Sequence, residues 1–313
     1  MKEQTNEGNV RIKIVGIGGG GENAVERMLE IGIPMIRCVT IHTDNGGFFR
    51  SHAETKIQIG AKETGGRGAG ADPTVGQRSA QENRKEIEDA IKDCDMVFLA
   101  AGMGGGTGTG AIPVVAEIAK NMGILTIAVV TLPFAFEGQK RMRQALDGVA
   151  NLEKIVDSLV VIPNNNLKRV CNSRITLSNA FEKADDVLVQ TVKNLVDVIQ
   201  TTAYINCDFA DISSVVKDSG RMHVAVGVAS GNNRAEKIIE QIKHNSLLDS
   251  SVDGATGVML CISGAEDIGL DEIDSIAGKV SELASKNANI IFGLRFDDTM
   301  EEQLKAVLIA TKK

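Results

Sequence analysis

Apolar residues follow two alternating patterns along the first half of the chain. Short, predominantly apolar runs predict buried β-strands, and stretches with an apolar residue at every third or fourth position predict helices. The predicted strands are 11–17, a segment that ends near 43–44, 95–101, 124–131 and 158–162. Four helices are predicted: one after Gly21, one at 77–92, one after Gly110 and one at 140–156. Strands that alternate with helices predict a parallel sheet covered on both faces, and such sheets bind ligands at the carboxyl ends of their strands.

The second half begins with a long periodic segment. Apolar residues recur at helical spacing from Leu177 to Gln200, which predicts one helix of about six turns at about 3.6 residues per turn. Further helices are predicted at 211–217, 234–244 and 272–285, with strands at 222–229, 258–263, 290–295 and 306–311. We therefore predict an α/β protein in which a Rossmann-like, parallel-sheet domain is joined by a long central helix to a smaller α+β domain. The predicted divisions are a disordered extension at 1–10, the first domain at 11–176, the central helix at 177–201 and the second domain at 202–313.

Charge and composition argue against several classes of protein. The 313 residues include 34 Lys and Arg against 41 Asp and Glu, a net charge of -7, with one Tyr and no Trp. A nucleic-acid groove needs a basic surface and often stacking rings, so we expect no nucleic-acid partner. No apolar run approaches the roughly 18 residues of a membrane span, and the polar N-terminus carries no secretion signal, so we expect no membrane insertion. The five cysteines are widely spaced without a C-x-x-C pair, which indicates a reduced, cytoplasmic protein with neither a disulfide framework nor a zinc site, and we assign no metal-ligating residues.

The 33 glycines of the chain are clustered in loops between predicted strands and helices. Gly18–Gly21 and Gly102–Gly110 each follow a predicted strand and precede a predicted helix. A helix N-terminus offers free N–H groups and the positive end of the helix dipole, which favour a bound anion. Two such loops indicate a triphosphate more readily than a buried pyrophosphate. No Walker-type G-x-x-x-x-G-K-[ST] occurs, which excludes an ordinary P-loop.

The first glycine loop also fits a different class of protein. Gly16-x-Gly18-x-x-Gly21 matches the dinucleotide fingerprint, and Asp44 lies close to the usual place of a ribose-binding acid. An NAD-dependent oxidoreductase therefore stays open as an alternative.

Several motifs carry a resemblance to a known family. GGGTGTG at 104–110 is the tubulin signature motif. Four other motifs resemble those of the FtsZ family of bacterial tubulin homologues in order and spacing: GIGGGGENAV at 16–25, GAGADP at 68–73, FEGQKR at 136–141 and NCDFAD at 206–211. The similarity runs from about Arg11 to Ala310. It implies a cytoskeletal protein that binds and hydrolyses GTP, polymerises head to tail with copies of itself into protofilaments, and has a role in cell division.

The resemblance also implies a set of nucleotide-binding residues, with GTP or GDP as the ligand and Mg²⁺ as a cofactor. The residues implied around the phosphates are Gly19, Gly20, Gly21, Gly70, Ala71, Gly104, Gly105, Gly106, Thr107 and Gly108. Those implied around the sugar and the rest of the nucleotide are Asp44, Thr131, Glu137 and Arg141, and those implied around guanine are Asn23, Asn164, Phe181 and Asp185. A side chain at Gly106 is expected to fill the space that the phosphates need.

Asp185 has side-chain chemistry that suits guanine. Its carboxylate can accept hydrogen bonds from both the N1–H and the N2–H2 groups of guanine, whereas adenine presents an acceptor at N1. Phe181 lies one helical turn before Asp185 and can stack on the base. We therefore expect GTP to be preferred over ATP.

An acidic motif after the central helix suggests how hydrolysis occurs. Asn206, Asp208 and Asp211 form an N-x-D-x-x-D pattern, and two carboxylates beside the triphosphate of the same subunit would weaken GTP binding by repulsion. The resemblance implies that this loop enters the nucleotide pocket of the next subunit, where Asp208 and Asp211 orient and polarise the attacking water. Hydrolysis then requires assembly. A structural alternative is that Asp211 is the N-cap of the following helix, with Asp208 in a turn.

Some positions depart from the family pattern. Glu22 replaces a small or neutral residue beside the phosphate loop, where a carboxylate costs electrostatic energy unless it points to solvent or helps to hold a cation. His42 stands where Asn is common, 45–47 replaces a more Ala-rich loop, and 201–204 lacks the Pro-Gly often found before the acidic loop. These departures leave open a paralogous filament protein that binds GTP with little hydrolysis.

The end of the chain also differs from that of typical relatives. The sequence stops at Lys313, without the linker and short terminal peptide that tether typical relatives to membrane adaptors. We therefore expect no adaptor binding through a C-terminal peptide of this chain. It is either a truncated form or a paralogue that works without those partners.

Overall fold

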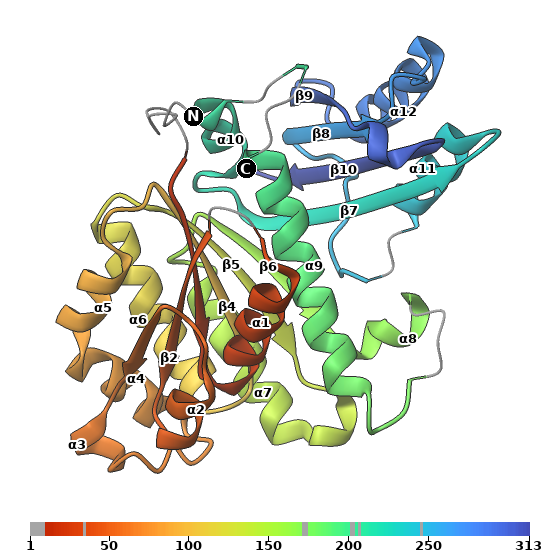
Figure 1. Ribbon diagram of the computed structural model, residues 1–313. Helices are drawn as coiled ribbons and strands as arrows, with labels where there is room; N and C mark the ends of the chain where they lie inside the picture. Colours follow the sequence, from red (N-terminus) through yellow and green to blue (C-terminus); the bar gives the residue numbers. More distant parts are fainter. Residues whose placement is uncertain (1–9, 34–35, 171–174, 201–203, 206–207, 245–246) are drawn as a thin grey trace.

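The computed structural model describes residues 10–33, 36–170, 175–200, 204–205, 208–244 and 247–313. Within them the chain forms a sheet of ten strands in the order β3-β2-β1-β4-β5-β6-β7-β10-β8-β9 (Figure 1). The strands are β1 Ile12–Ile17, β2 Ile36–His42, β3 Thr55–Gln58, β4 Met96–Gly102, β5 Leu125–Leu132, β6 Ser158–Pro163, β7 Gly220–Ser230, β8 Gly257–Gly264, β9 Asn289–Phe296 and β10 Gln303–Thr311. The predicted α/β fold is confirmed.

The first six strands are parallel, and this direction decides where the loops lie. Every neighbouring pair from β3 to β6 is parallel. A short parallel pairing of β6 with β7, Ser158 with Gly220, joins the second half to the first. Beyond it β10 is antiparallel to both β7 and β8, and β8 is parallel to β9. The loops that follow β1, β2, β4, β5 and β6 therefore meet at one end of the sheet, which we call the carboxyl end, and the opposite end is the amino end.

Helices cover both faces of the parallel sheet, as the apolar pattern predicts. One face packs against α1 (Gly18–Ile31) and α9 (Ala180–Gln200), and the other against α5 (Arg84–Ile91), α6 (Thr107–Asn121) and α7 (Gln139–Leu152). The sheet of the second half packs against α11 (Arg234–Lys243) and α12 (Leu270–Leu283). The remaining helices are α2 Asn45–Arg50, α3 Ala61–Thr64, α4 Pro73–Glu82, α8 Leu167–Val170 and α10 Phe209–Val216, with 3-10 turns at Ala135–Glu137, Asn164–Asn166 and Asp298–Met300. Over the described residues, none of these helices combines the length and apolar character needed to cross a membrane.

Several elements differ from their predictions, among them the short helices α2, α3 and α8, which were not predicted. The helix expected at 77–92 is divided into α4 and α5 at Asn83, which leaves the helical conformation and accepts a hydrogen bond from the Gly60 N–H at 2.8 Å. The central helix begins at Ala180, because the Asn179 side chain accepts a hydrogen bond from the Thr176 N–H at 2.7 Å and holds a turn before it. Strand β3 was not predicted, since its sequence TKIQ is too short and polar to show a strand pattern.

Polar contacts at the amino end of the sheet join the two halves of the chain. Lys120, near the end of α6, donates hydrogen bonds to the carboxylates of Asp157 at 2.7 Å and Asp218 at 2.9 Å. The hydroxyl of Ser158, the first residue of β6, donates to the carbonyl of Val216 at 2.7 Å. Val216 is the last residue of α10, so α10 lies at the amino end (Figure 1, top), away from α2, α3 and α7 at the carboxyl end (bottom).

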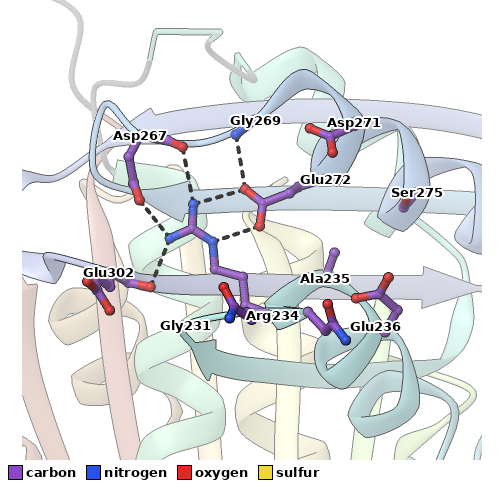
Figure 2. A pocket seen from close by; sticks show the side chains of 12 residues that line it. Gly231, Arg234, Ala235, Glu236, Asp267, Gly269, Asp271, Glu272, Ser275 and Glu302 are labelled. Atoms are coloured by element: carbon purple, nitrogen blue, oxygen red, sulfur yellow. Dashed lines mark hydrogen bonds and ion pairs between the residues drawn. The ribbon is translucent and has the colours of Figure 1, made fainter.

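A buried arginine connects the elements of the second half. Arg234 is 5% exposed and lies beside a polar hollow of about 460 Å³ between α11 and α12 (Figure 2). Its Nε and Nη2 donate to Glu272 at 2.7 and 2.9 Å, and its Nη1 donates to Asp267 at 3.0 Å. The backbone carbonyls of Asp267 and Glu302 accept the other two hydrogen bonds, at 3.3 and 2.8 Å. All N–H donors of the guanidinium are thus used inside the protein, so Arg234 stabilises the fold and offers no donor to a ligand in this hollow.

We expect Arg234→Met to lower the free energy of unfolding by about 3 kcal/mol, because it leaves the half-buried Glu272 carboxylate without its partner. Arg221→Met is a matched control, since Arg221 is 46% exposed and pairs with Glu153 at 2.9 Å. Loss of that exposed pair should cost less than about 1 kcal/mol. Urea denaturation followed by circular dichroism measures both losses. Equal losses in the two variants would contradict the role assigned to Arg234.

Candidate nucleotide site

The two glycine loops come together at the carboxyl end of the sheet. Helix α1 begins at Gly18 directly after β1, and α6 begins at Thr107 after β4, the strand next to β1. A Cβ atom on Gly18 would lie 3.0 Å from the backbone nitrogen of Gly108, and Gly18 has a left-handed φ of 68°. A side chain there would be both crowded and strained. The contact places the N-termini of α1 and α6 side by side, and their free N–H groups and helix dipoles favour a polyphosphate.

A third loop, which contains the predicted residues Gly70 and Ala71, packs against the second glycine loop. Gly70 and Ala71 have left-handed φ values of 58° and 60°. The Ala71 carbonyl accepts a hydrogen bond from the Gln144 side chain of α7 at 3.1 Å, and Asp72 caps α4 by accepting from the Thr74 N–H at 2.8 Å. The predicted phosphate residues of three segments therefore lie together at one edge.

The glycines of these loops have two different roles. A Cβ atom on Gly19, Gly70 or Gly105 would have no other atom of the described ranges within 4 Å, so these three positions face open space. A Cβ atom on Gly106 would lie 2.7 Å from that of Ala69 and 2.9 Å from the backbone nitrogen of Asp72, at a φ of −78°. The expectation that a side chain at Gly106 would extend into the phosphate space was therefore wrong. Gly106 is required because the third loop packs directly on it.

Two further predicted residues lie in the loop after β2 and at the start of α6. The hydroxyls of Thr43 and Thr107 are 2.7 Å apart, which ties the loop after β2 to the second glycine loop. Asp44 follows Thr43 and caps α2 by accepting a hydrogen bond from the Gly47 N–H at 2.8 Å. The carboxylate that the sequence suggests for the nucleotide thus also holds the start of a helix.

The loops after β5 carry the predicted sugar-side and phosphate-side residues. Glu137 and Arg141 form an ion pair at 3.2 Å, and Arg141 is half exposed. A Cβ atom on Gly104 would lie 2.7 Å from the Arg141 carbonyl oxygen, so the second glycine loop rests on the start of α7. The Thr131 carbonyl accepts a hydrogen bond from the Met103 N–H at 2.9 Å, which holds the end of β5 against the same loop.

The predicted guanine-binding residues lie on α1, on α9 and after β6. Asn23 donates a hydrogen bond to Asp185 at 3.3 Å, which brings α1 and α9 together at these two side chains. Burial raises the pKa of Asp185 to about 6, so its carboxylate is mainly ionised at neutral pH. Asn164 is buried, and its Oδ1 atom has no hydrogen-bond partner within the part of the chain that the structure describes. Phe181 is 47% exposed. An unpartnered polar atom and a half-exposed ring are expected where a ligand completes a site.

The acidic loop lies at the other end of the sheet. Asp208 is the N-cap of α10 and accepts a hydrogen bond from the Asp211 N–H at 2.7 Å, and the Asp211 carboxylate accepts one from the Asp208 N–H at 3.2 Å. This reciprocal capping box reverses the expected roles, because Asp208 rather than Asp211 is the N-cap. Asn206 lies outside the described residues. The structure thus brings the predicted nucleotide residues together and leaves Asp208 and Asp211 apart from them.

Some residues at the site were not identified from the sequence. Phe134 and Phe136 stack on each other at 5.1 Å and meet the ring of Phe181 edge-on at 5.5 and 6.2 Å. Thr43 contacts Thr107 of the second glycine loop, and Gln144 donates a hydrogen bond to Ala71 of the third loop. The FEGQKR motif includes Phe136, but no sequence signal links these residues to partners far along the chain.

These features define a class of α/β protein in which glycine loops bring the N-termini of two helices together at the carboxyl end of a parallel sheet. A model of the tubulin/FtsZ family GTPase domain matches residues 11–172, and one of the FtsZ family C-terminal domain matches residues 220–312. The structure is similar to the empty FtsZ dimer of M. jannaschii, at 41% identity and a TM-score of 0.89, over 99% of this chain and 89% of that chain. CetZ2 of Haloferax volcanii, solved as a GTPgS-bound protofilament, shares the fold at 17% identity and a TM-score of 0.81, over 97% of this chain and 93% of that one.

The chain therefore belongs to the tubulin/FtsZ family, and it is a GTPase. The resemblance carried by the glycine and acidic motifs is confirmed. The alternative of an NAD-dependent oxidoreductase is overturned by the same matches, since they cover both halves of the chain.

We expect Gly105→Val to abolish GDP binding, because the valine side chain would occupy the open space that is expected to hold the phosphates. The protein should stay folded, since Gly105 has no positive φ and an added Cβ atom meets no neighbouring atom of the described residues. Gly278→Val is the control, since Gly278 is an exposed position of α12 that also faces open space. Equilibrium dialysis with GDP, combined with thermal melting, compares the two variants. Wild-type affinity in a folded Gly105→Val protein would place the phosphates elsewhere.

Proposed function

We propose that this chain is the subunit of a head-to-tail filament in which GTP bound to one subunit is hydrolysed at its contact with the next. The supporting observation is the separation of the two sets of functional residues. The glycine loops lie at the carboxyl end of the sheet and α10 at the amino end, and β5 between them has eight residues. At about 3.3 Å per residue the two ends are roughly 25 Å apart. Carboxylates at that distance cannot reach the GTP of their own subunit, whereas they can reach that of a second copy.

Guanine recognition in this proposal depends on Asp185. Its ionised carboxylate accepts hydrogen bonds from N1–H and N2–H2 of the base, which adenine cannot donate in that arrangement. Asn23 already bonds one carboxylate oxygen and so orients the group. Phe181 supplies an exposed ring face one turn earlier on α9, backed by Phe134 and Phe136.

Phosphate binding depends on backbone groups and one metal ion. The N–H groups at the starts of α1 and α6 bind the phosphate oxygens. No group of three or more His, Cys, Asp or Glu side chains that could hold a metal was found within the described ranges. If Mg²⁺ is bound together with the nucleotide, the Thr107 hydroxyl at the start of α6 would supply a protein oxygen for it. When bound, Mg²⁺ neutralises charge on the β- and γ-phosphates.

Hydrolysis then requires a water molecule placed in line with the γ-phosphate. Asp208 and Asp211 of the incoming subunit are held by their mutual capping box, so both carboxylates enter the contact with limited freedom. One carboxylate accepts a hydrogen bond from the water and polarises it towards phosphorus, while the loop N–H groups stabilise the phosphoryl charge. Because the two halves of the site belong to different subunits, hydrolysis follows assembly.

The relatives support an assembling role. One similar structure is described as an FtsZ dimer, and another as a protofilament with a bound GTP analogue. We infer that this chain likewise assembles with itself in the cytoplasm and serves cell division. A paralogue that binds GTP with little hydrolysis would form the same filament, and phosphate release distinguishes the two functions.

We expect Asp185→Ala to reduce the preference for GTP over ATP and inosine triphosphate by about 10- to 100-fold, since it removes about 1.5 to 3 kcal/mol of hydrogen bonding to a charged group. In the unaltered protein the preference should weaken as the pH falls below about 6, because Asp185, whose pKa is raised to about 6, becomes protonated there. Asp186→Ala is the matched control, since Asp186 pairs with Arg27 instead. Competition against labelled GDP measures the preference. Unchanged selectivity in Asp185→Ala would assign guanine recognition to other residues.

We expect Asp211→Asn to bind GTP normally and to release phosphate about 10² to 10⁴ times more slowly, the range for positioned acid-base groups. Asparagine can still accept the Asp208 N–H, so the start of α10 is preserved. Mixing this variant with Gly105→Val should restore turnover, because the intact acidic loop of one meets the loaded pocket of the other. A phosphate-release rate of the mixture equal to the sum of the separate rates, in filaments that contain both variants, would contradict the shared site.

A further inference from the structure

Three of the unusual positions lie together beside the first glycine loop. Glu22 follows Gly21 on α1, His42 ends β2, and Gly47 lies near the start of α2. The Glu22 Oε2 atom is 3.6 Å from the His42 Nδ1 atom. A Cβ atom on Gly47 would lie 2.4 Å from the same nitrogen, so glycine at this position makes room for the imidazole. The three departures therefore form one unit, which we call the Glu22–His42 pair.

Both members of the pair are buried, and the imidazole has no hydrogen bond. His42 is 0% exposed, Glu22 is 3% exposed, and neither ring nitrogen of His42 has a hydrogen-bond partner among the described residues. A buried imidazole without a hydrogen bond, next to a buried carboxylate, costs free energy, and a proton shared between the two groups reduces that cost. Burial raises the pKa of Glu22 and lowers the pKa of His42, which brings their proton affinities closer together.

Three other charged groups face the pair. Arg50 of α2 places its Nη2 atom 3.7 Å from the Glu22 Oε2 atom, although its side chain is 71% exposed. Asp44, after β2, and Glu26, one turn further along α1, add negative charge. Glu26 is itself bound by the His52 ring at 2.7 Å. The pair thus has one exposed cation and two carboxylates around it.

The pair also connects the two glycine loops. Glu22 directly follows the first loop, and it lies about one helical turn, or about 5.4 Å, from the N-terminus of α1. A carboxylate there competes with the phosphates for the positive end of the helix dipole. His42 precedes Thr43, whose hydroxyl contacts that of Thr107 in the second loop at 2.7 Å. A change at the pair is therefore transmitted to both loops that are expected to hold the phosphates.

We propose that Glu22 and His42 act as a positioning pair that holds one proton when nucleotide phosphates enter the site, so that nucleotide affinity is linked to proton uptake. This inference rests on the proposed nucleotide site. With the proton the pair is neutral overall, whichever member carries it, and without the proton it bears one negative charge beside the phosphates. Nucleotide affinity is therefore highest when the pair is protonated, and it falls as the pH rises and the proton is lost.

The test compares dissociation constants for GDP between the wild-type protein and Glu22→Gln, from about pH 5 to about pH 8. The amide keeps the shape of the side chain without its charge. The ratio of wild-type to variant constants cancels the titration of the nucleotide and of Asp185, which are common to both proteins. We expect the ratio to be near one at low pH and to rise about 3- to 10-fold at high pH, as one unfavourable charge is restored in the wild type. A ratio that does not change with pH would overturn the proposal, and a purely structural role for Glu22 would give that result.

Two further variants sharpen the test. Glu26→Gln removes a carboxylate that raises the pKa of both Glu22 and His42, so its affinity for GDP should fall at a lower pH than that of the wild type. The exposed Arg50 side chain favours the charged form of Glu22, so Arg50→Gln should make the pair hold its proton to a higher pH. The affinity of this variant for GDP should therefore fall at a higher pH than that of the wild type. An unchanged midpoint in Arg50→Gln would contradict the pair even if Glu22→Gln failed to fold. Wild-type protein that bound no GDP at any pH would instead refute the nucleotide site itself.

Discussion

The common direction of the first six strands is the constraint on which the rest of the structure depends. It gathers the loops after β1, β2, β4, β5 and β6 at the carboxyl end, where two helices begin beside each other. It also places Asp157, Lys120 and the end of α10 together at the amino end. The candidate nucleotide site at one end and the acidic helix start at the other are thus consequences of sheet geometry. The proposed sharing of one active site between two copies follows from that separation.

Glycine maintains the carboxyl end in two physically different ways. A Cβ atom on Gly16 would lie 2.3 Å from the carbonyl oxygen of Gly21, and one on Gly21 would lie 2.3 Å from that of Ala100, so these glycines let β1, α1 and β4 pack closely. A Cβ atom on Gly19 or Gly105 would have no other atom of the described residues within 4 Å, so these positions border open space. The same residue type therefore builds the site in one place and keeps it open in another.

The fold class could be predicted because its signals are local. Buried strands such as β4 and β5 are continuous apolar runs, and each glycine loop directly joins a strand to a helix. The division at Asn83 could not be predicted, because it depends on a hydrogen bond to Gly60, which is distant in sequence. The contact between Glu22 and His42 was missed for the same reason, since each appeared in the sequence only as a separate departure.

The candidate site was predictable to a similar extent. The motifs suggest the phosphate loops and Asp185 as parts of one pocket, and the structure brings Asn23 to Asp185. The motif did not reveal that Asp208, rather than Asp211, is the N-cap of α10. Both residues can cap a helix, and the choice between them depends on backbone geometry. The distinct role of Gly106 required knowledge of where the third loop packs.

The central claim is that one GTPase site is made by two copies of the chain. The most direct measurement is the rate of phosphate release per GTP-loaded subunit as a function of total protein concentration, with sedimentation measured in the same samples. The shared site predicts a rate per subunit close to zero at low concentration that rises where assembly begins. A rate per subunit that stays constant far below the assembly threshold would show that each subunit hydrolyses GTP alone, and would contradict the account.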